Sequence, residues 1–417
     1  MRIAFIVGKF PTVSETFILN QIVGLIERGH EVDIYADVPG DTNKIHADVE
    51  KYNLLQRTYY ASTPSNRFLR ILKGFGLLLG HGYKAPAVLM RSLNFSKYNY
   101  TKYCDQGTIL RLLYSAIPLL RKPAYDIIHC HFGPYGLRGV LLREIGAIQG
   151  KVVTTFHGFD VGMYPRQTHP GIYQKLFQLG DLYTANTQFT ANQAIALGCP
   201  EDKIIKLPMG LDLSKYAFRS ISLGNGEPVK IITVARLVEK KGIEYAIKAV
   251  AKVAANYPNL EYRIVGDGEM RQSLESLIAQ LNLSEKVKIL GWKTQEEVRQ
   301  LYAESHIFIL SSVTSASGDR EGQGLVLQEA QARGLPVLST LHNGIPDGVL
   351  DGESGFLVPE RDVDALAAKL SYLVEHPQNW TKMGQAGRTF VEKNYDINRL
   401  NDQLVEIYQQ INCVGAG

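Results

Sequence analysis

Cysteine is scarce in this sequence, and long apolar runs are missing. Four cysteines occur among 417 residues, far apart and in no paired spacing: Cys104, Cys130, Cys199 and Cys413. This pattern argues against a disulfide framework and is typical of reduced cytosolic thiols. No apolar run approaches the roughly 20 residues that cross a bilayer. The first run, residues 3–7, is too short for a signal peptide and predicts a strand. We therefore expect a cytoplasmic protein, either soluble or associated with the inner face of the membrane.

The chain as a whole also lacks a strong excess of one charge sign. Lys and Arg number 45 against 41 Asp and Glu. No nucleic-acid-binding motif accompanies the basic residues, so we exclude nucleic acid as a partner. The length predicts two domains, and a hydrophobic share of 45% with 21% charged residues argues against disorder.

One segment departs from this charge balance. Residues 67–122 carry ten Lys or Arg and one acidic residue, Asp105, and aromatic and aliphatic side chains are interleaved with them. A basic amphipathic surface of this kind would suit the anionic face of a bilayer, where lipid-linked molecules reside. The alternative is a set of ordinary helices with solvated charges, and the sequence alone leaves both open.

Short apolar runs alternate with helical patterns nearly from end to end, which is typical of parallel α/β sheets. A helix from about Ser14, its expected N-cap, to Arg28 separates the first two predicted strands. The strands of the first half are predicted at residues 3–7, 31–36, 126–131, 151–156, 182–185 and 203–207. Those of the second half are predicted at residues 230–234, 261–265, 287–290, 307–310, 337–340 and 356–358.

These two series of strands predict an α/β protein with two Rossmann-like, doubly wound domains that face a central cleft. The first domain is expected at residues 1–218 and the second at 229–395, joined by a polar, Gly-rich linker at 219–228. A single dinucleotide-binding domain is the main competitor. However, the first strand leads into Gly8-Lys9-Phe10-Pro11, which lacks the G-x-G-x-x-G fingerprint.

A loop of the second domain has the residue types that bind a diphosphate. Arg236 and Lys241 lie between the strand at 230–234 and a helix that begins at about Ile243. A guanidinium fork, an ammonium group and the free N–H groups of a helix start all favour phosphate oxygens. For either residue alone, an ordinary solvated charge is the alternative.

Two carboxylates lie near the start of a later helix, with seven residues between them. Glu321 stands at or just before the helix start, and Glu329 lies about two turns inside. Carboxylates accept hydrogen bonds from hydroxyl groups, which suits a sugar ring at Glu321 and a ribose at Glu329. The alternatives are a charge at Glu321 that stabilises the helix dipole and an exposed helix charge at Glu329.

Taken together, these motifs resemble family 4 of the glycosyltransferases. The resemblance rests on Arg236-Leu237 with Lys241-Gly242, Gly266-Asp267-Gly268, the pair Glu321 and Glu329, Ile345-Pro346, Gly352 and Gly355-Phe356-Leu357-Val358-Pro359. In the first half the chain is similar to the branch that builds bacterial exopolysaccharides, colanic-acid-type enzymes among them. That similarity lies in Phe10-Pro11, Ser14-Glu15-Thr16-Phe17-Ile18 and His129-Cys130-His131-Phe132-Gly133.

The resemblance implies a GT-B fold and a retaining transfer without metal or cofactor. A sugar would move from a nucleotide-diphosphate donor, a UDP- or GDP-sugar, to a carbohydrate acceptor that is lipid-linked. Arg236 and Lys241 would hold the diphosphate, Glu329 the ribose and Glu321 the transferred sugar. The other donor contacts implied are Gly266, Gly291, Trp292, Gly322, Gly324 and Leu325, with the turn at 290–292 meeting the nucleobase. A last helix, within residues 396–417, would cross back to the first domain.

The first domain offers fewer candidates. His157 follows the strand at 151–156, where a His can hydrogen-bond a sugar or stabilise developing charge. The resemblance places His157 beside the donor sugar, as a catalytic residue together with Glu321, and Asp160 near the acceptor. His131, at the end of its strand, and Lys9 are further candidates for the acceptor.

The run His129-Cys130-His131 also suggests a metal site, which we reject. Strand alternation puts His129 and His131 on one face and Cys130 on the other, and no third ligand has a suitable spacing.

Two departures from the family pattern are Gly8-Lys9, where tandem glycines are usual, and Asp347, where Glu is usual.

No carboxylate pair in the first domain suggests double displacement. We therefore favour a front-face route, in which the leaving phosphate helps to deprotonate the incoming hydroxyl. Functions from other classes are a sugar-nucleotide epimerase, a pyridoxal-phosphate phosphorylase and a non-catalytic nucleotide-sugar-binding protein.

Overall fold

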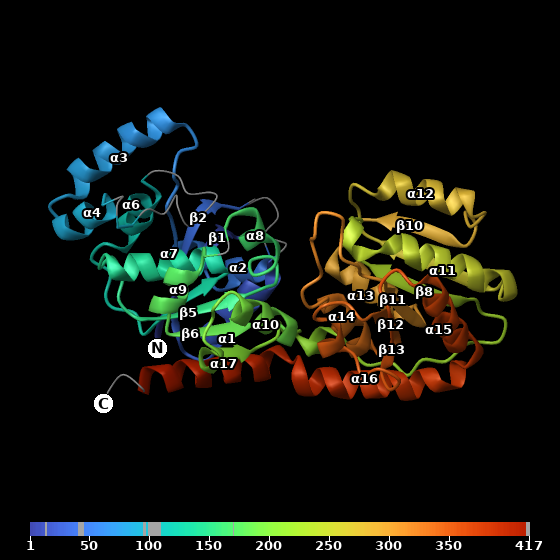
Figure 1. Ribbon diagram of the computed structural model, residues 1–417. Coiled ribbons are helices and arrows are strands. Elements are labelled where there is room, and N and C mark those ends of the chain that lie inside the picture. The colour runs from blue at the N-terminus through green and yellow to red at the C-terminus, as the bar shows by residue number, and fades with distance from the viewer. Residues whose placement is uncertain (13–14, 41–45, 95–96, 99–109, 170, 414–417) are drawn as a thin grey trace. The chain divides into compact units, whose positions relative to one another are not determined.

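The structure, a computed structural model, describes residues 1–12, 15–40, 46–94, 97–98, 110–169 and 171–413 (Figure 1). The chain divides into two compact units, each with its own parallel sheet. Unit 1 comprises Met1–Asn186, Thr190–Leu207 and Asn401–Gly417, and unit 2 comprises Thr187–Phe189 and Pro208–Leu400. Among the described residues, no helix is long and apolar enough to cross a membrane.

The sheet of unit 1 has seven parallel strands in the order β3-β2-β1-β4-β5-β6-β7. Its central strands are buried on both faces, since Ile3, Phe5 and Ile128 have no exposed area. This double burial explains why these strands read as apolar runs without alternation. The strands are β1 (Arg2–Phe10), β2 (Glu31–Pro39), β3 (Thr58–Tyr60), β4 (Ile127–His131), β5 (Lys151–Phe156), β6 (Leu182–Ala185) and β7 (Ile204–Lys206).

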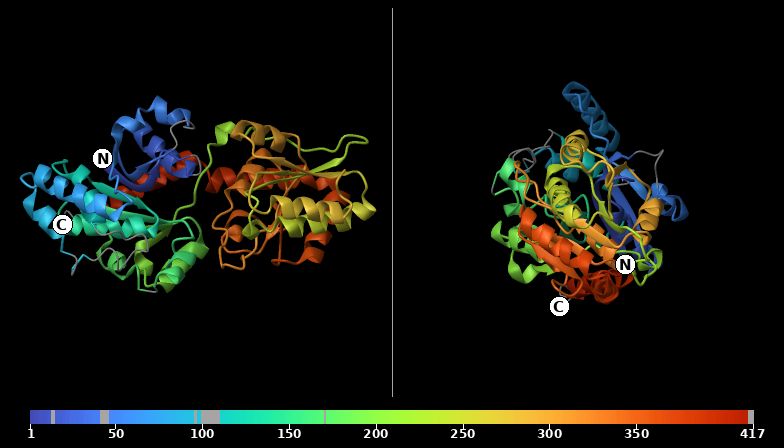
Figure 2. Two further views of the ribbon diagram at one scale, coloured as in Figure 1. Left: turned by 90° about the horizontal axis from the view of Figure 1, so that it is seen from above. Right: turned by 90° about the vertical axis from the view of Figure 1, so that its right-hand side faces the viewer.

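Helices lie on both faces of this sheet (Figure 2). Helix α1 buries Ile18, Ile22 and Leu25 at helical spacing, and α7 packs against β4 and β5. The helices of this region are α1 (Thr16–Glu27), α2 (Ala47–Lys51), α3 (Arg67–His81), α4 (Pro86–Ser92), α6 (Arg111–Ala116), α7 (Gly133–Glu144), α8 (Met163–Gln167), α9 (Gln174–Leu179) and α10 (Gln188–Ala196). The predicted cap Ser14 lies outside the described residues.

The sheet of unit 2 has six parallel strands in the order β10-β9-β8-β11-β12-β13. Its strands are β8 (Val229–Val234), β9 (Leu260–Val265), β10 (Val287–Gly291), β11 (Ile307–Leu310), β12 (Val337–Thr340) and β13 (Gly355–Val358). Its helices are α11 (Ile243–Asn256), α12 (Arg271–Gln280), α13 (Gln295–Ala303), α14 (Leu325–Arg333), α15 (Val363–Glu375) and α16 (Trp380–Asn394).

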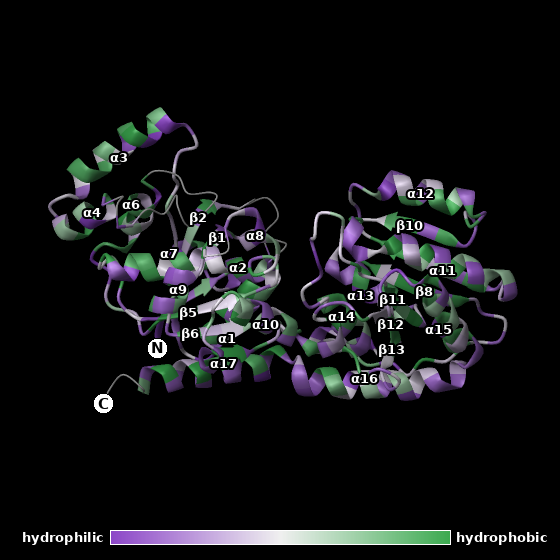
Figure 3. Cartoon of the chain, viewed as in Figure 1, coloured by the Kyte–Doolittle hydropathy of each residue, from purple (hydrophilic) through white to green (hydrophobic). Residues whose placement is uncertain are grey.

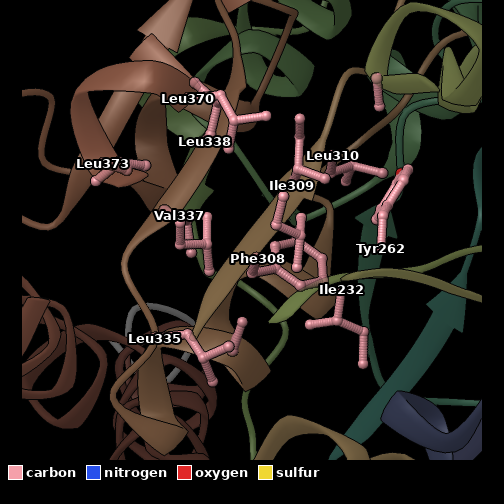
Figure 4. Close-up of a cluster of buried hydrophobic side chains, with 14 of the residues drawn as sticks. Ile232, Tyr262, Phe308, Ile309, Leu310, Leu335, Val337, Leu338, Leu370 and Leu373 are labelled. Carbon is pink, nitrogen blue, oxygen red and sulfur yellow. The ribbon is translucent and has the colours of Figure 1, made fainter. Parts of the chain in front are cut away.

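The core of unit 2 is built from side chains of the central strands and of the helices that cover them (Figure 4). Ile232, Phe308 and Leu338 come from three neighbouring strands, and Leu370 comes from α15. All four have no exposed area, so the burial of apolar surface holds the sheet and its covering helices together.

The predicted fold class is confirmed: both sheets are parallel and follow the doubly wound order. All twelve predicted strands are present, with ends that differ by a few residues. The strand β3 was not predicted. It has three residues and pairs only with β2, at the edge of the sheet, so it leaves too short a pattern to detect.

The predicted linker at residues 219–228 differs from the observed division, which falls between Leu207 and Pro208. Ile221 is 3% exposed and belongs to the core of unit 2. The backbone N–H of Arg219 also donates to the Arg333 carbonyl at 3.1 Å. The polar, Gly-rich composition therefore marks a surface segment that is anchored to unit 2, and not a free connection.

The last helix, α17 (Ile397–Cys413), begins in unit 2 and belongs to unit 1 from Asn401 onward. Arg28 at the end of α1 donates to Asp402 at 2.7 Å. Deeper in unit 1, the Tyr408 hydroxyl lies 2.6 Å from Nδ1 of His129, and both side chains have no exposed area. Nε2 of His129 lies 2.7 Å from the Thr155 hydroxyl. A buried polar chain thus joins α17 to β4 and β5.

Replacing Tyr408 by Phe tests this attachment. The change leaves Nδ1 of a buried imidazole without its partner, which typically costs about 1–3 kcal/mol. We expect a lower melting temperature for Tyr408→Phe than for wild type by circular dichroism. Tyr83→Phe is the control, because Tyr83 is 72% exposed. Equal melting temperatures for Tyr408→Phe and wild type would show that α17 does not depend on this contact.

Candidate functional site

Doubly wound sheets bind ligands beyond the carboxyl ends of the strands, at the point where the strand order reverses. This point lies between β1 and β4 in unit 1 and between β8 and β11 in unit 2. Nearly all predicted site residues follow one of the strand ends, so each unit contributes a set of candidates. The two sets are described separately.

In unit 2, the loop from β8 to α11 carries Arg236 and Lys241. Arg236 is exposed, whereas the side chain of Lys241 is 13% exposed. Gly242, between the loop and α11, has a φ of +59°, and a Cβ there would lie 1.9 Å from the Ser311 carbonyl oxygen. Only glycine therefore allows the loop to fold onto the end of β11, which brings Lys241 to the segment that carries Glu321.

Lys241 and Glu321 form an ion pair in which each side chain is 13% exposed. Burial opposes ionisation of the Glu321 carboxyl, but the charge of Lys241 outweighs it and lowers the pKa. Beside this pair, Lys240 forms a second ion pair with Asp319 at 3.0 Å. The structure thus brings together two predicted residues, one for the phosphate and one for the sugar, as an ion pair.

Two residues that the sequence analysis did not identify, His342 and Glu360, hold the backbone of Glu321 in place. Nε2 of His342 accepts a hydrogen bond from the backbone N–H of Glu321 at 3.1 Å. Nδ1 of His342 lies 2.6 Å from the Glu360 carboxylate, which fixes the proton of the neutral ring on Nδ1. His342 and Glu360 follow β12 and β13, so their positions after parallel strands were the signal that could have identified them.

The segment between Glu321 and α14 is also fastened to its surroundings. The side-chain amide of Gln323 makes two 2.8 Å hydrogen bonds with the backbone of Met209, accepting from its N–H and donating to its carbonyl. Gly322 and Gly324 lie on either side of this anchor, and α14 begins at Leu325. The predicted donor contacts at Gly322, Gly324 and Leu325 therefore lie at a helix N-terminus, where N–H groups favour anions.

Glu329 lies inside α14 and is buried, with 8% of its area exposed. The Tyr302 hydroxyl donates to its carboxyl group at 3.2 Å. Burial raises the pKa of Glu329 to about 7, although hydrogen bonds from Tyr302 and Tyr216 and the charge of Arg299 lower it. The alternative of an exposed helix charge is thus wrong for Glu329, and its carboxyl has tyrosine partners in unit 2.

The ends of β9 and β10 bring Gly266 and Gly291 together. The Gly266 N–H donates to the Gly291 carbonyl at 2.9 Å. The next residue, Trp292, is 67% exposed. The turn predicted to meet a nucleobase therefore presents an aromatic ring and backbone groups at the same edge of the sheet as Arg236.

In unit 1, His157 stands at the end of β5 and is half-buried against aromatic rings. Its ring centroid lies 4.7 Å from that of Phe17 and 4.5 Å from that of Phe132. Nε2 of His157 lies 3.0 Å from Nδ1 of His131. Burial lowers the pKa of His157 to about 3, so the ring is neutral at pH 7 and can form hydrogen bonds without carrying a charge.

His131 does not reach the surface. It has no exposed area and stacks behind His157, with ring centroids 5.3 Å apart. Its ring also stacks on His129 at 4.5 Å, which confirms that the two side chains share one face of β4. The predicted contact of His131 with an acceptor is not available in this arrangement, because its side chain has no exposed area.

Asp160 is likewise buried, at 1% exposed, and its role is local. Its carboxylate accepts hydrogen bonds from the backbone N–H groups of Gly133, His157 and Gly158 at 2.9–3.0 Å. Burial raises its pKa to about 6 against these hydrogen bonds. Asp160 therefore ties the end of β5 to the start of α7 and holds His157 in place, which differs from the predicted contact with an acceptor.

Lys9 is exposed but belongs to a strand. β1 continues through Gly8 and Lys9, and Lys9 pairs with Val38 of β2. The strand therefore does not break into a glycine-rich turn that could place N–H groups around a phosphate. The side chain lines a small pocket with Glu15 and His46 at the edge of unit 1.

Within the described ranges, no three His, Cys, Asp or Glu side chains gather in a way that could hold a metal ion.

Comparisons with known proteins show the family of this chain. Residues 215–390 match the family described as Glycosyl transferases group 1, and residues 91–215 match Glycosyltransferase Family 4. The chain is 36% identical to WcaL of Salmonella typhimurium, a candidate colanic acid biosynthesis glycosyltransferase, over 99% of this chain and 100% of that protein. It is 34% identical to AmsK of Erwinia amylovora, an amylovoran biosynthesis glycosyltransferase, over the same shares of the two chains.

Among solved structures, HepE of Anabaena in complex with UDP has a TM-score of 0.72 at 18% identity. The match covers 98% of this chain and 100% of that chain. This likeness shows the fold, a pair of Rossmann-like domains of the GT-B type. Together with the full-length relatives, it establishes that the chain is a glycosyltransferase and belongs to family 4.

Proposed function

We propose that this enzyme acts in exopolysaccharide biosynthesis and transfers a sugar, with retention and without a metal ion, from a UDP- or GDP-sugar to a lipid-linked carbohydrate. The observation that carries the donor site is the Lys241–Glu321 ion pair at the switch point of unit 2, with Arg236 exposed in the same loop. The names of WcaL and AmsK support the biosynthetic setting, and the UDP complex of HepE supports the class of donor.

Lys241 can serve the diphosphate and Glu321 at once. Its ammonium group has three donors, so it can keep its bond to Glu321 and still bind a phosphate oxygen. Arg236 adds a planar fork from the same loop, and α14 presents its N-terminus. These groups would take up the negative charge that develops on the leaving nucleoside diphosphate, which is the role a metal ion plays in other transferases.

The ionised carboxylate of Glu321 accepts hydrogen bonds and is therefore suited to hydroxyl groups of the transferred sugar. In unit 1, the neutral ring of His157 is suited to hydrogen bonding with a sugar hydroxyl. In the front-face route, the bond from the sugar carbon to the acceptor oxygen forms on the side from which the phosphate departs. The hydroxyl proton passes to an oxygen of the leaving phosphate, so no protein base is required.

Loss of either basic group should weaken donor binding. A hydrogen bond to a charged group contributes about 1.5–3 kcal/mol, which corresponds to roughly ten- to a hundredfold in affinity. We expect Lys241→Ala and Arg236→Ala each to reduce the thermal stabilisation by the preferred nucleoside diphosphate. Lys252→Ala is the control, since Lys252 is a half-exposed residue of α11 that pairs with Asp364.

The same thermal-shift experiment, run with UDP, GDP and ADP, tests the function itself. Selective stabilisation by one nucleoside diphosphate that EDTA leaves unchanged is the expected result. If none of the three stabilises the wild-type protein, the proposed donor site is wrong; if EDTA abolishes stabilisation, the metal-free route is wrong.

Glu329 is the proposed ribose contact, and two variants separate this role from support of the fold. Glu329→Ala should raise the donor KM about ten- to a hundredfold, because a bond between the carboxyl and a ribose hydroxyl would be lost. Tyr302→Phe removes a buried partner of Glu329 but keeps the carboxyl group, so its donor KM should change much less. An unchanged donor KM in Glu329→Ala would remove Glu329 from the donor site.

The raised pKa of Glu329 also predicts a pH dependence of stability. Because the folded state favours the protonated carboxyl, this group contributes stability below its ordinary pKa of 4.5, and that contribution is lost as pH rises through about 7. At about 1.4 kcal/mol per pKa unit, the loss over the whole shift amounts to at most roughly 3–4 kcal/mol. We expect the fall in melting temperature between pH 5 and pH 8 to be smaller in Glu329→Gln than in wild type. An equal fall in the two proteins would contradict the raised pKa.

A further inference from the structure

Helix α3 carries its apolar side chains on the outside. Phe68, Leu72, Phe75 and Leu79 are 73%, 60%, 61% and 71% exposed. Their spacing of i, i+4, i+7 and i+11 puts them on one stripe of the helix, which we call the outer face of α3. Helix α3 lies at the periphery of unit 1 in Figure 1, and hydrophobic residues recur along it in Figure 3.

The opposite side of α3 is packed, so the orientation of the helix is fixed. Arg70, a charged residue of the helix, is 7% exposed and donates to the carbonyls of Pro64 and Ser65 at 2.8 and 2.7 Å. The buried Tyr114 of α6 donates to the Arg70 carbonyl at 2.8 Å. Gly74 lies so close to Leu110 that a Cβ would meet it at 2.8 Å.

This arrangement reverses the usual surface helix, which turns its apolar stripe inward and its charges outward. Burying Arg70 while exposing two Phe and two Leu is costly in water. The cost is removed if the outer face meets an apolar phase.

Basic residues surround the outer face. At 100° per residue, Arg67 and Lys73 flank the apolar stripe on opposite sides of α3. Beyond the helix, Tyr83 is 72% exposed, and the Arg121 guanidinium lies 5.7 Å from its ring centroid. In the sequence, residues 67–122 have ten basic residues and one acid.

A pocket adjoins this basic end of the surface. Arg121 and Lys122 line it together with Val88 of α4 and residues 146–149, around about 500 Å³ of space that is open to solvent. The charges of Arg121 and Lys122 favour a small anion beside this pocket, and the Lys122 ammonium group itself lies 3.7 Å from the ring centroid of Tyr59. Arg121 also reaches the ring of Tyr83, which follows α3 in the chain, so one basic residue contacts both the pocket and the segment after α3.

We propose that the outer face of α3 docks unit 1 onto an anionic lipid bilayer, with its apolar side chains at the acyl boundary and the pocket holding a lipid phosphate. The combination of an apolar stripe with basic flanks is that of helices which lie in the membrane interface. Anionic headgroups complement the basic excess of residues 67–122. A second copy of the chain fits less well, because self-pairing would set two surfaces of the same sign against each other.

This inference deepens the proposed function and rests on it, since docking would bring unit 1 to the surface where a lipid-linked acceptor lies. The docking itself requires neither donor nor acceptor. Binding to lipid can therefore be measured without transfer, and transfer can be measured with a water-soluble acceptor.

The test is co-sedimentation of the full chain with phosphatidylcholine vesicles that contain or lack phosphatidylglycerol. Wild type should bind the anionic vesicles in a salt-sensitive manner. The combined variant Phe68→Ser, Leu72→Ser, Phe75→Ser and Leu79→Ser should bind them at least about tenfold more weakly. Arg121→Gln with Lys122→Gln should lose the preference for phosphatidylglycerol. Val38→Ser with Leu55→Ser, which removes two exposed apolar side chains elsewhere in unit 1, should bind like wild type.

Several outcomes would overturn the proposal. They are absence of wild-type binding to both vesicles, equal binding by the four-serine variant, and wild-type self-association in sedimentation velocity that this variant abolishes. Melting temperatures show whether the four-serine variant is folded; if it is not, Leu72→Ser with Phe75→Ser replaces it. Retained transfer to a water-soluble acceptor with lost vesicle binding supports docking. Absence of any sugar transfer by the wild-type protein would instead count against the proposed function.

Discussion

The parallel direction of every strand in a sheet is the constraint from which the site follows. Because all strands of a sheet run the same way, their carboxyl ends gather at one edge, and the helices that follow them begin there. In unit 2 this edge collects Arg236, Lys241, Glu321 and His342, which lie far apart in the sequence. The strand order reverses between β8 and β11, which is where doubly wound folds bind ligands, so the fold gathers these charges at the expected place for an anion.

Burial then decides the charge of each group at these edges. Lys241 and Glu321 are equally shielded, and the charge of Lys241 lowers the pKa of Glu321, so this carboxyl is ionised. Glu329 has hydroxyl partners but no ion pair within hydrogen-bonding distance in the described structure, and its pKa rises to about 7. His157 is enclosed by aromatic rings and is neutral. The proposed chemistry therefore places positive charge on Arg236 and Lys241 and leaves hydrogen bonding to the others.

The outer face of α3 and the site in unit 2 are both exceptions to the rule that apolar side chains are buried and charged ones exposed, but in different ways. At the site, charges are buried in pairs, so their desolvation is offset by Coulomb attraction and hydrogen bonds. On α3, the apolar side chains are exposed, and the described structure offers them no compensating contact. Local sequence rules fail most often at functional places, and here both exceptions point to ligands, a nucleoside diphosphate in one case and a lipid surface in the other.

The sequence by itself determined the alternation of strands and helices, the side chains that share a face of β4, and the family motifs, because all of these depend on short-range spacing. The predicted ends of the strands were sufficient to place the residues that follow them at the edges of the sheets: Arg236, Lys241, Glu321 and His157. Only the tertiary structure decided that His131 and Asp160 are buried, that residues 219–228 belong to unit 2 and that α3 faces outward. It also revealed His342 and Glu360 behind Glu321. The physical reason is that burial, pKa and partners depend on residues remote in the chain, which no local pattern records.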